Sequence, residues 1–410
     1  MELDYSQARA VNGIISDKKI ISITGMPGSG KTFTVRAILD EIHAFSSPKD
    51  VYLACPTGKA AKVLIDALDV ALENEPSTIH RMLGCRGHDW EYNEYNKLSA
   101  SWVILDESSM IDSMLMARIM KSVSDDCRFI LVGDKDQLPP VGAGCVFRDI
   151  IAAGSGDTVF RLEVNHRQQE GSLIADACGK VIDGCKPTFG IPGEYTLGGA
   201  REDDLFFIEE DEKELIPEVL VGVVRDWHDA GKDYCVLAPQ KTGVCGVEKI
   251  NKYLQEQLNP PVPGTQELKT LPWLTLREGD KVMHIKNNYS LDVFNGFTGT
   301  ITEIEPISEQ VTVDFDGQIV TYCESSDLKE LVLGYCMTIH KSQGSQYQYG
   351  AIICHSSHYY MWSRQLLYTA LSRFREELYV IGNKKALKRA VSNSVEDCRQ
   401  TYLSLALGEE

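Results

Sequence analysis

The 410-residue chain lacks the features that mark secreted, membrane and metal-ribbon proteins. No apolar run reaches the ~18 residues of a membrane-spanning helix, and residues 1–7 are acidic and polar, so we expect no membrane segment and no signal peptide. No Cys-x-x-Cys pair occurs among the twelve cysteines. His355 and His358 follow Cys354, but no second pair of ligands is evident, so we expect free cytoplasmic thiols rather than zinc.

Positive charge is also scarce. Lys and Arg number 41 against 59 Asp and Glu, which gives a net charge of −18. This balance argues against a sequence-blind basic coat on nucleic acid. It leaves room for a local basic groove, whose binding would be confined and sensitive to salt.

The length suggests two or three domains. A hydrophobic content of 43% and a charged content of 24% are ordinary for a globular protein. The chain is therefore long enough and apolar enough to bury a large core.

The glycine-rich stretch at residues 25–32 reads Gly-Met-Pro-Gly-Ser-Gly-Lys-Thr and meets the spacing G-x-x-x-x-G-K-T in full. It lies between a predicted buried strand, residues 19–24, and a predicted helix, residues 33–39. In that setting backbone N–H groups face a phosphate chain, and the helix N-terminus adds positive charge. We predict a P-loop in which Lys31 reaches the β- and γ-phosphates and Thr32 places a hydroxyl on Mg²⁺. The predicted nucleotide-binding residues here are Gly25, Pro27, Gly28, Ser29, Gly30, Lys31 and Thr32.

Polar residues near the P-loop could either bind a ligand or be ordinary surface residues. Gln7 precedes the P-loop strand and is either an amide that reads an adenine edge or an ordinary surface glutamine. A buried strand at residues 51–55 leads into Thr57 and Lys59, at the edge where open α/β sheets bind ligands. Lys59 suits a phosphate there, although it is otherwise part of a solvated face.

Acidic and amide side chains follow two further strands. Residues 102–105 form an apolar strand that ends in Asp106 and Glu107. In a P-loop protein Asp106 would hold Mg²⁺ and Glu107 would polarise the attacking water. The strand at residues 129–133 leads into a loop with two prolines, where Gln137 is placed to contact the γ-phosphate or its water.

Residues 84–100 are polar, contain the aromatics Trp90, Tyr92 and Tyr95, and are too short for a domain. We predict a protruding β-hairpin whose aromatic rings stack on bases or wedge a duplex. The alternative is a small loop whose aromatics pack on the body. His80, just before this segment, is a weaker candidate for a nucleic-acid contact.

The second half predicts another parallel α/β sheet with an insertion. Residues 174–182 and 215–227 are typical of helices, and 236–238, 351–354 and 378–381 of buried strands. Over about residues 275–330 the pattern becomes β-branched and alternating, with the hairpin signals Asn295-Gly296 and Asp316-Gly317. We predict a small SH3-like β-barrel there.

Eight segments resemble the motifs of superfamily 1 helicases, in the order found in that family. Those resembling motifs I, Ia, II and III are residues 25–32, 56–64, 103–112 and 131–144. Those resembling the arginine-bearing segment and motifs IV, V and VI are residues 163–168, 236–243, 337–344 and 367–373. The resemblance is to the RecD/Dda type of superfamily 1B and covers nearly the whole chain. Because no long extension precedes Gln7, we expect the compact Dda-like arrangement.

The resemblance assigns roles to residues of the second half. It implies that Arg167 and Arg373 reach the γ-phosphate across a cleft between two lobes, and that Gly344 contacts the nucleotide. It also implies that Thr338, His340 and Lys341 face single-stranded DNA. A structural helix arginine is the alternative for Arg373, and a core histidine for His340. The implied catalytic set is Lys31, Asp106, Glu107, Gln137, Arg167 and Arg373, and the implied DNA contacts are Thr57, Lys59, His80, Trp90, Tyr92, Thr338, His340 and Lys341.

Two positions depart from the family pattern. Motif V often continues Gly-Ser-Glu, whereas this chain has Gln346. Motif VI often reads Thr-Arg-Ala, whereas Arg373 is followed here by Phe374. We expect these departures to modify the activity rather than abolish it, because the Gln346 amide still forms hydrogen bonds and Arg373 is kept.

The resemblance implies an α/β fold with two RecA-like parallel-sheet lobes, a β-hairpin insertion (1B) and an SH3-like β-barrel insertion (2B). The expected parts are lobe 1A at residues 1–83 and 101–160, hairpin 1B at 84–100, lobe 2A at 161–274 and 331–410, and barrel 2B at 275–330. The barrel either buttresses the hairpin and lines the DNA path or is a passive spacer.

The implied activity is that of an ATP-dependent 5′-to-3′ single-stranded DNA translocase and helicase that uses ATP and Mg²⁺. A translocase that displaces proteins with little unwinding, a non-hydrolytic nucleotide switch and an RNA substrate are the alternatives. The expected partners are single-stranded DNA, duplex junctions and proteins of replication, recombination or repair. We expect a cytoplasmic protein, without membrane association, whose minimal motor is a monomer.

Overall fold

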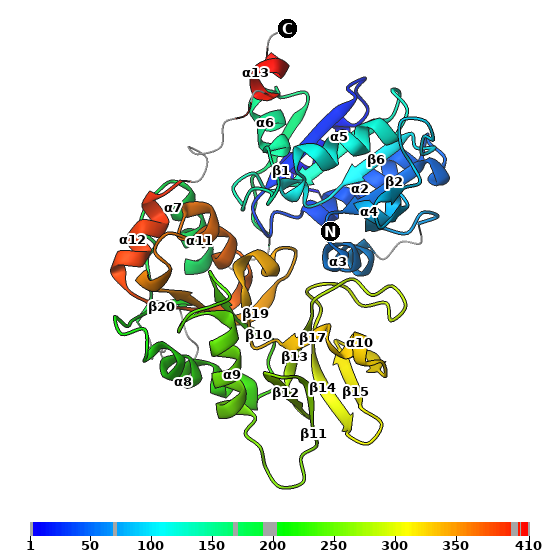
Figure 1. The fold of residues 1–410 in the computed structure, drawn as a ribbon. Coiled ribbons are helices and arrows are strands. Elements are labelled where there is room, and N and C mark those ends of the chain that lie inside the picture. The colour runs from blue at the N-terminus through cyan, green and yellow to red at the C-terminus, as the bar shows by residue number, and fades with distance from the viewer. Residues whose placement is uncertain are drawn as a thin grey trace. The chain divides into compact units, whose positions relative to one another are not determined.

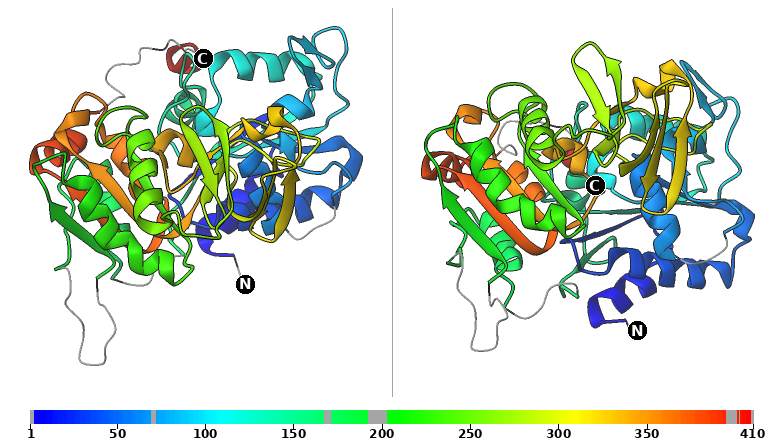
Figure 2. Two further views of the ribbon diagram at one scale, coloured as in Figure 1. Left: turned by 60° about the horizontal axis from the view of Figure 1, so that its bottom comes forward. Right: turned by 90° about the horizontal axis from the view of Figure 1, so that it is seen from below.

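The computed structural model describes residues 3–68, 72–166, 171–191, 203–394, 401 and 403–408. The chain divides into two compact units (Figures 1 and 2). Unit 1 comprises residues 1–168 and 395–410, and unit 2 comprises residues 169–394. Each contains a parallel sheet with helices on both faces, which confirms the predicted α/β class with two RecA-like lobes.

The sheet of unit 1 has six parallel strands in the order β3-β2-β6-β7-β1-β8. Their bounds are β1 Ile20–Gly25, β2 Val51–Cys55, β3 Ser77–Thr78, β6 Trp102–Leu105, β7 Arg128–Gly133 and β8 Val159–Leu162. Successive residues serve opposite faces: Ile104 packs into one core cluster, whereas Val103 and Leu105 pack into the other. Burial on both faces explains why these strands are continuous apolar runs.

Helices cover each face of this sheet. On one face lie α1 Tyr5–Gly13, α2 Lys31–His43 and α3 Gly58–Leu68. On the other lie α4 Ile79–Met82, α5 Ser113–Ser122 and α6 Val146–Ala153. The short elements of this unit are η1 Pro48–Asp50, η2 Ser108–Met110, β4 Cys85–Arg86, β5 Asp89–Trp90 and α13 Leu403–Gly408.

Unit 2 has a five-stranded parallel sheet in the order β18-β10-β19-β20-β9. Its strands are β9 Leu205–Glu209, β10 Tyr234–Ala238, β18 Cys336–Thr338, β19 Tyr347–Cys354 and β20 Phe374–Gly382. Around it lie α7 Leu173–Ile182, α8 Ile216–Asp229, α9 Val247–Leu258, α11 Arg364–Leu371, α12 Lys384–Ser392, η3 Ile339–Ser342 and η4 Ser356–His358. Helices α8 and α9 lie on one side of the sheet, and α7, α11 and α12 on the other (Figure 1). The helices predicted at 174–182 and 215–227 are thus confirmed as α7 and α8.

An antiparallel insertion interrupts unit 2. Its five-stranded sheet has the order β16-β15-β14-β13-β17, and β11 and β12 pair beside it. The bounds are β11 Glu267–Leu271, β12 Leu274–Arg277, β13 Lys281–His284, β14 Thr298–Glu305, β15 Gln310–Phe315, β16 Gln318–Tyr322, α10 Ser325–Leu328 and β17 Leu331–Leu333. This confirms the predicted SH3-like insertion.

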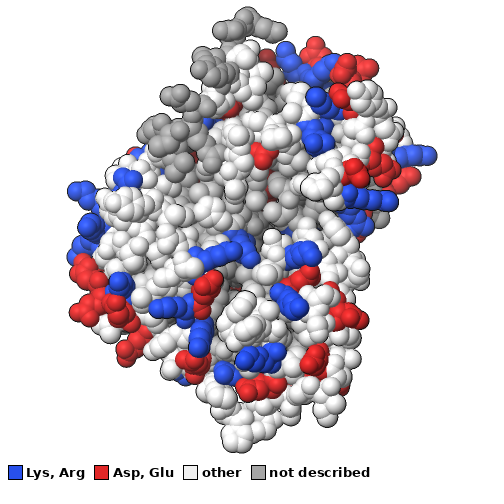
Figure 3. Space-filling model, viewed as in Figure 1, with Lys and Arg blue, Asp and Glu red and all other residues white. Residues whose placement is uncertain are grey.

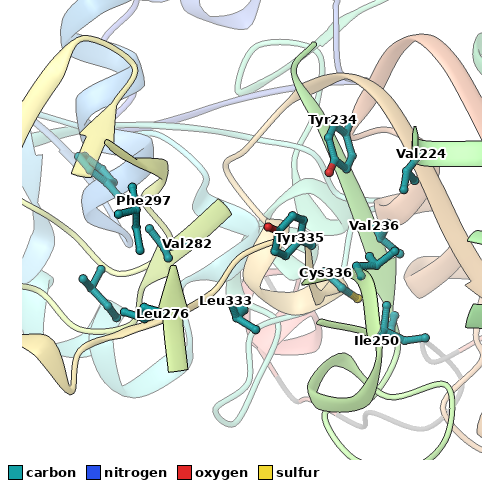
Figure 4. Packing of buried hydrophobic residues seen from close by; sticks show 14 of the residues in the cluster. Val224, Tyr234, Val236, Ile250, Leu276, Val282, Phe297, Leu333, Tyr335 and Cys336 are labelled. Carbon is teal, nitrogen blue, oxygen red and sulfur yellow. The ribbon is translucent and has the colours of Figure 1, made fainter. Parts of the chain in front are cut away.

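The insertion and the parallel sheet of unit 2 share one hydrophobic core. Val282 and Phe297 lie on the insertion side and Val236 and Ile250 on the sheet side, with Tyr335 between them (Figure 4). Residues of both groups belong to one buried hydrophobic cluster, so the barrel is packed as part of unit 2.

A buried carboxylate reinforces this junction. Asp280 is fully buried and accepts hydrogen bonds from Gln255 Nε2 at 2.6 Å, Asn259 Nδ2 at 2.8 Å, the Arg277 amide at 2.8 Å and Tyr335 OH at 3.0 Å. These donors come from α9, the end of β12 and the segment after β17. Burial raises the pKa of Asp280, and the hydrogen bonds oppose that change.

Three boundaries differ from those expected. The limit at 160/161 cuts through β8, which pairs with β1 and so belongs wholly to unit 1. Residues 395–410 belong to unit 1 rather than lobe 2A, since α13 packs on α6 and Thr401 Oγ1 donates to Asp149 Oδ2 at 2.7 Å. β17 pairs with β13, so the insertion extends beyond residue 330. Sequence reasoning missed these because the contacts are long-range.

No helix within the described ranges is both long and apolar enough to cross a bilayer.

Candidate active site and nucleic-acid interface

The strand order of unit 1 gathers three predicted motifs at one edge of the sheet. The P-loop follows β1, Asp106 and Glu107 follow β6, and Gln137 lies in the loop after β7. Strands β6, β7 and β1 are adjacent and parallel, so their carboxyl ends meet at the edge where open α/β folds bind ligands.

The P-loop has the backbone that phosphate binding needs. Gly28 has φ 92° and Gly30 has φ 77°, a left-handed conformation that glycine adopts at little cost. Lys31 begins α2, and its Nζ donates to the carbonyls of Gly25 at 2.7 Å and Met26 at 3.1 Å. Thr32 follows in the first turn. The ammonium group is therefore held above the loop by weak carbonyl acceptors that a phosphate chain can replace.

Gln7 is buried beside the P-loop, with 1% of its surface exposed. Its Nε2 donates to the Ser29 carbonyl at 3.3 Å, and its Oε1 accepts from the Asp4 amide at 3.1 Å in a capping box. A Cβ atom on Gly30 would lie 2.3 Å from Gln7 Nε2. This excludes the interpretation of Gln7 as an ordinary surface glutamine.

Asp106 and Glu107 form a half-buried acidic pair, and the backbone of Glu107 is strained. Glu107 has φ 52°, which is unusual outside glycine, and its amide donates to Asp106 Oδ1 at 2.8 Å. Burial, and after it the charge of Glu107, raises the pKa of Asp106 to about 7. A cation bound there would favour the charged form of both groups.

Three buried polar atoms at this edge have no hydrogen-bond partner among the described residues. They are Ser29 Oγ, Glu107 Oε2 and Gln137 Oε1, one on each of the three loops. Gln137 Nε2, by contrast, donates to Asp134 Oδ2 at 3.2 Å. Unsatisfied buried oxygens are costly unless a ligand serves them. The residues therefore fit a Mg²⁺–nucleotide, with Asp106 and Thr32 as the candidate metal ligands.

The predicted DNA-binding residues of unit 1 lie on the neighbouring strands of the same edge. Thr57 and Lys59 follow β2, and His80 follows β3. Thr57 Oγ1 accepts from the Ala60 amide at 3.2 Å and so caps α3, while His80 is exposed. Burial, with Arg118 second, lowers the pKa of His80. The two candidate sites thus share one sheet edge.

The hairpin at residues 84–100 differs from the expectation. Strands β4 and β5 have two residues each. Trp90 stacks on His80 at 5.2 Å between ring centroids, lies 4.4 Å below the Arg118 guanidinium, and packs with Tyr92 against the core. This packing favours the alternative of a small loop whose aromatics pack on the body, and the contact of Trp90 and Tyr92 with DNA stays a prediction.

Tyr95 belongs to the aromatic residues predicted for this segment but was not in the list of predicted DNA contacts. It follows β5, beyond the turn at residues 87–88 that joins β4 to β5, and 91% of its surface is exposed. Asn93 Oδ1 accepts from the Tyr95 amide at 2.9 Å and so fixes the turn. The Asn93-Glu94-Tyr95 sequence, a turn former just before an aromatic residue, was the available signal.

Of the two predicted arginines, the structure describes only one. Arg167 lies outside the described residues. Arg373 is buried in unit 2, where it donates to the carbonyls of Thr369 at 3.0 Å and Ser345 at 3.2 Å and to Ser372 Oγ at 2.9 Å. Gly344, with φ 73°, precedes Ser345. Arg373 therefore joins motifs V and VI within unit 2.

The remaining candidates lie at the carboxyl edge of the unit 2 sheet. Thr338 ends β18 and caps η3 by accepting from the Lys341 amide at 3.3 Å, and His340 is exposed in that turn. Burial, with the charge of Lys241 second, lowers the pKa of Lys341. Lys241 follows the adjacent strand β10 and was not among the predicted contacts. Two neighbouring ammonium groups favour a bound anion, such as a phosphate backbone.

On the face shown in Figure 3, Lys and Arg side chains are interspersed with Asp and Glu rather than gathered into one basic surface. This agrees with the net charge of −18 and with local, confined anion sites.

Family models match three parts of the chain. An AAA domain matches residues 7–143, the SH3 domain of ATP-dependent RecD-like DNA helicases matches residues 250–315, and a UvrD-like helicase C-terminal domain matches residues 333–381. They cover both RecA-like lobes and the insertion.

Curated relatives align over almost the whole chain. The ATP-dependent RecD2 DNA helicase of Deinococcus radiodurans is 31% identical over 389 residues, which is 95% of this chain and 50% of that protein. The RecBCD enzyme subunit RecD of Mycolicibacterium smegmatis is 27% identical over 94% of this chain and 72% of its own. The chain thus spans about half the length of the first relative and about seven tenths of the second.

Solved structures show the same fold. A Pif1 helicase from Bacteroides, in complex with ADP-AlF3 and ssDNA, has a TM-score of 0.60 and 20% identity over 99% of both chains. The Pif1 helicase from Candida albicans has a TM-score of 0.57 and 17% identity over 100% of both. The Pif1 structures share the fold, and the three domain matches together with the RecD relatives show that the chain belongs to the RecD-like family of ATP-dependent DNA helicases.

Proposed function

We propose that the chain hydrolyses ATP in order to move 5′-to-3′ along single-stranded DNA and to separate duplex ahead of it. The observation that carries the proposal is the shared edge of the unit 1 sheet. The P-loop, the acidic pair and Gln137 end strands β1, β6 and β7, and Thr57, Lys59 and His80 end the neighbouring strands β2 and β3. A nucleotide and a nucleic acid bound there would share the β2–β6 boundary.

Different residues of unit 1 would carry out different steps of ATP hydrolysis. Lys31 would leave the carbonyls of Gly25 and Met26 to neutralise charge on the phosphates. Glu107, held in its strained conformation, would accept a proton from the attacking water, and Gln137 would orient that water. Mg²⁺ bound by Asp106 and Thr32 would supply further positive charge.

Unit 2 would contribute the second DNA grip and the remaining charge. Thr338, His340, Lys341 and the additional Lys241 would hold the phosphate backbone. Arg167 and Arg373 would act on the nucleotide, which for Arg373 requires release from its carbonyl acceptors. Because Arg373 binds the Ser345 carbonyl beside motif V, its release would move the segment that carries the DNA contacts. This supports a coupling of ATP state to DNA grip.

The test is ATP turnover with and without oligo(dT). We expect Lys31→Ala to lower DNA-stimulated hydrolysis by at least 10²-fold, because the phosphates lose their main cation. Lys49→Ala, an exposed lysine at η1 of the same unit, is the matched control and should retain full turnover. Wild-type-like turnover by Lys31→Ala would refute the P-loop assignment, and a wild-type chain that binds ATP without turnover would indicate a nucleotide switch.

A second candidate function is a translocase that displaces proteins and barely unwinds. The short hairpin favours it, since Trp90 and Tyr92 pack on the lobe and leave Tyr95 as its exposed aromatic ring. The motor residues would be the same in both cases. Comparing strand separation with removal of a bound protein from single-stranded DNA distinguishes the two.

The setting of this activity is part of the proposal. The chain would act on single-stranded DNA and duplex junctions as a monomer in the cytoplasm, with proteins of replication, recombination or repair. Comparing stimulation of the ATPase by DNA and RNA oligomers tests the preference for DNA.

A further inference from the structure

The roles assigned above make no use of a hydrogen bond between Asp4 and His166 in unit 1. His166 Nε2 lies 2.7 Å from Asp4 Oδ2, and both residues border the P-loop. Asp4 is the N-cap of α1, the helix that carries Gln7. His166 lies in the segment after β8, next in sequence to Arg167.

The pair closes a ring of contacts around Gln7. Asp4 Oδ1 accepts from the Gln7 amide at 2.9 Å, and Gln7 Nε2 donates to the Ser29 carbonyl at 3.3 Å. The His166 amide donates to the Gly28 carbonyl at 2.9 Å. The ring therefore runs from Asp4 through His166 to the P-loop, and returns through Gln7.

A second contact ties the same two segments together. The Glu163 amide donates to Ser6 Oγ at 3.3 Å, and Ser6 Oγ donates to Asp4 Oδ1 at 2.6 Å. Burial alone would raise the pKa of Asp4, but hydrogen bonds from Ser6, Gln7 and His166 lower it to about 2. Asp4 is therefore a carboxylate whenever the protein is folded near neutral pH.

This ring determines which way the Gln7 amide faces. Its Oε1 accepts from the Asp4 amide and its Nε2 donates to the Ser29 carbonyl, so the oxygen and nitrogen ends are distinguished. A carboxamide oxygen has two lone pairs and its nitrogen two hydrogens, so one acceptor and one donor are left. Adenine offers a complementary donor and acceptor at N6 and N7, whereas guanine offers two acceptors at O6 and N7.

We propose that Asp4 and His166 are positioning residues for base selection: the hydrogen bond between them holds the Gln7 amide in the orientation that accepts an adenine nucleotide and rejects a guanine nucleotide. The proposal rests on the proposed nucleotide-binding role of Gln7 and the P-loop. It predicts that breaking the pair loosens Gln7 without touching the phosphate contacts. The loss should therefore appear in ATP binding and not in GTP binding.

The experiment measures equilibrium binding of Mg·ATP and Mg·GTP to the full chain by competition with a fluorescent ADP analogue. His166→Phe keeps a ring but removes the donor. Asp4→Ser keeps an N-cap oxygen for the Gln7 amide but is too short to reach His166. His166→Gln retains an N–H donor and serves as the rescue variant.

We expect His166→Phe and Asp4→Ser each to weaken ATP binding about fivefold, the effect of one hydrogen bond, with GTP binding changed less than twofold. The double variant should be no worse than either single variant, because both remove the same contact. His166→Gln should restore most of the preference for ATP. Circular dichroism and thermal unfolding of each variant confirm that it is folded.

Equal weakening of ATP and GTP, an unchanged preference, or additive effects in the double variant would overturn the proposal. Hydrolysis is measured on the same samples. If the wild-type chain shows DNA-stimulated turnover and the variants keep the full preference for ATP over GTP, this inference alone is refuted. Selective ATP binding that depends on the pair, without turnover, refutes the proposed function and leaves this inference standing.

Discussion

Glu107 has a strained backbone conformation at the carboxyl end of β6. Its backbone is left-handed directly after β6, and its amide donates a hydrogen bond to the carboxylate of the preceding residue, Asp106. Such strain persists only where surrounding structure enforces it. Its position at the carboxyl end of a buried strand was predictable from the order of the motifs, and its role as general base is part of the proposed function.

Outside the site, His358 gives a pH-dependent prediction. It is buried in η4, and burial, with His355 second, lowers its pKa to about 4 from an ordinary 6.5. Below pH 6.5 the unfolded chain binds a proton that the folded chain refuses, so this contribution to the free energy of unfolding falls as pH falls. We expect a loss of roughly 2 kcal/mol between pH 6.5 and pH 4.

Urea unfolding of wild type and His358→Gln at pH 7, 6, 5 and 4 measures this loss. The variant should show a shallower decline, because its side chain does not titrate. Parallel declines in the two proteins would mean that His358 does not contribute.

Which residues were predictable follows from the range of their contacts. The P-loop, Asp106 and Gln137 were found because each follows a strand within its own motif. The packing of Trp90 was not predictable from the local sequence, because its partner Arg118 lies on α5. Lys241 was passed over because its significance depends on Lys341, which the pairing of β10 and β18 brings near.

Among the elements, the SH3-like insertion is built to stay with unit 2. Its core is continuous with that of the parallel sheet, and Asp280 receives donors from both sides of the junction. A conformational change in unit 2 would therefore carry the insertion with it rather than leave it as a passive spacer.

We expect Asp280→Ala to lower the free energy of unfolding of unit 2 by about 3 kcal/mol, because several buried donors lose their acceptor. Glu303→Ala, an exposed carboxylate on β14, should change it by less than about 0.5 kcal/mol. Urea titrations followed by tryptophan fluorescence give both values. Similar stabilities for the two variants would show that Asp280 does not fasten the insertion.

The hairpin gives a second prediction for an element. If Tyr95 is the ring of this segment that stacks on a base at the fork, Tyr95→Ala should slow unwinding of a forked duplex at least fivefold, since stacking on a base is worth about 1–3 kcal/mol. DNA-stimulated ATPase should stay within twofold of wild type. Tyr360→Ala removes an equally exposed ring from unit 2 and should leave both activities unchanged.

Fork unwinding with a 5′ tail and ATPase assays with oligo(dT) provide the two measurements. Undiminished unwinding by Tyr95→Ala would argue against the hairpin as the separating element and favour the protein-displacing translocase.

Element boundaries were less predictable than element types. β8 was divided between two lobes because its partner β1 lies far back in the chain. α13 was assigned to the wrong lobe because its packing on α6 follows from tertiary contacts alone. Strand and helix character, in contrast, was visible in local apolar patterns such as those of β7 and α8.

For the molecule as a whole, two parallel-sheet units each present polar loops at the carboxyl edge of the sheet. Unit 1 carries the nucleotide motifs and one set of nucleic-acid candidates, and unit 2 carries a second set around Lys241 and Lys341. The net charge of −18 confines nucleic acid to such local sites. Under the proposed function, the two sets would be two DNA-binding sites and the motifs of unit 1 the single nucleotide site.

The most direct test of this account compares unwinding of a duplex with a 5′ single-stranded tail and the same duplex with a 3′ tail, in ATP and Mg²⁺. We expect the wild-type chain to separate the 5′-tailed duplex and to leave the 3′-tailed one intact, and Lys31→Ala to separate neither. Efficient unwinding from the 3′ tail, or unwinding by Lys31→Ala, would contradict it.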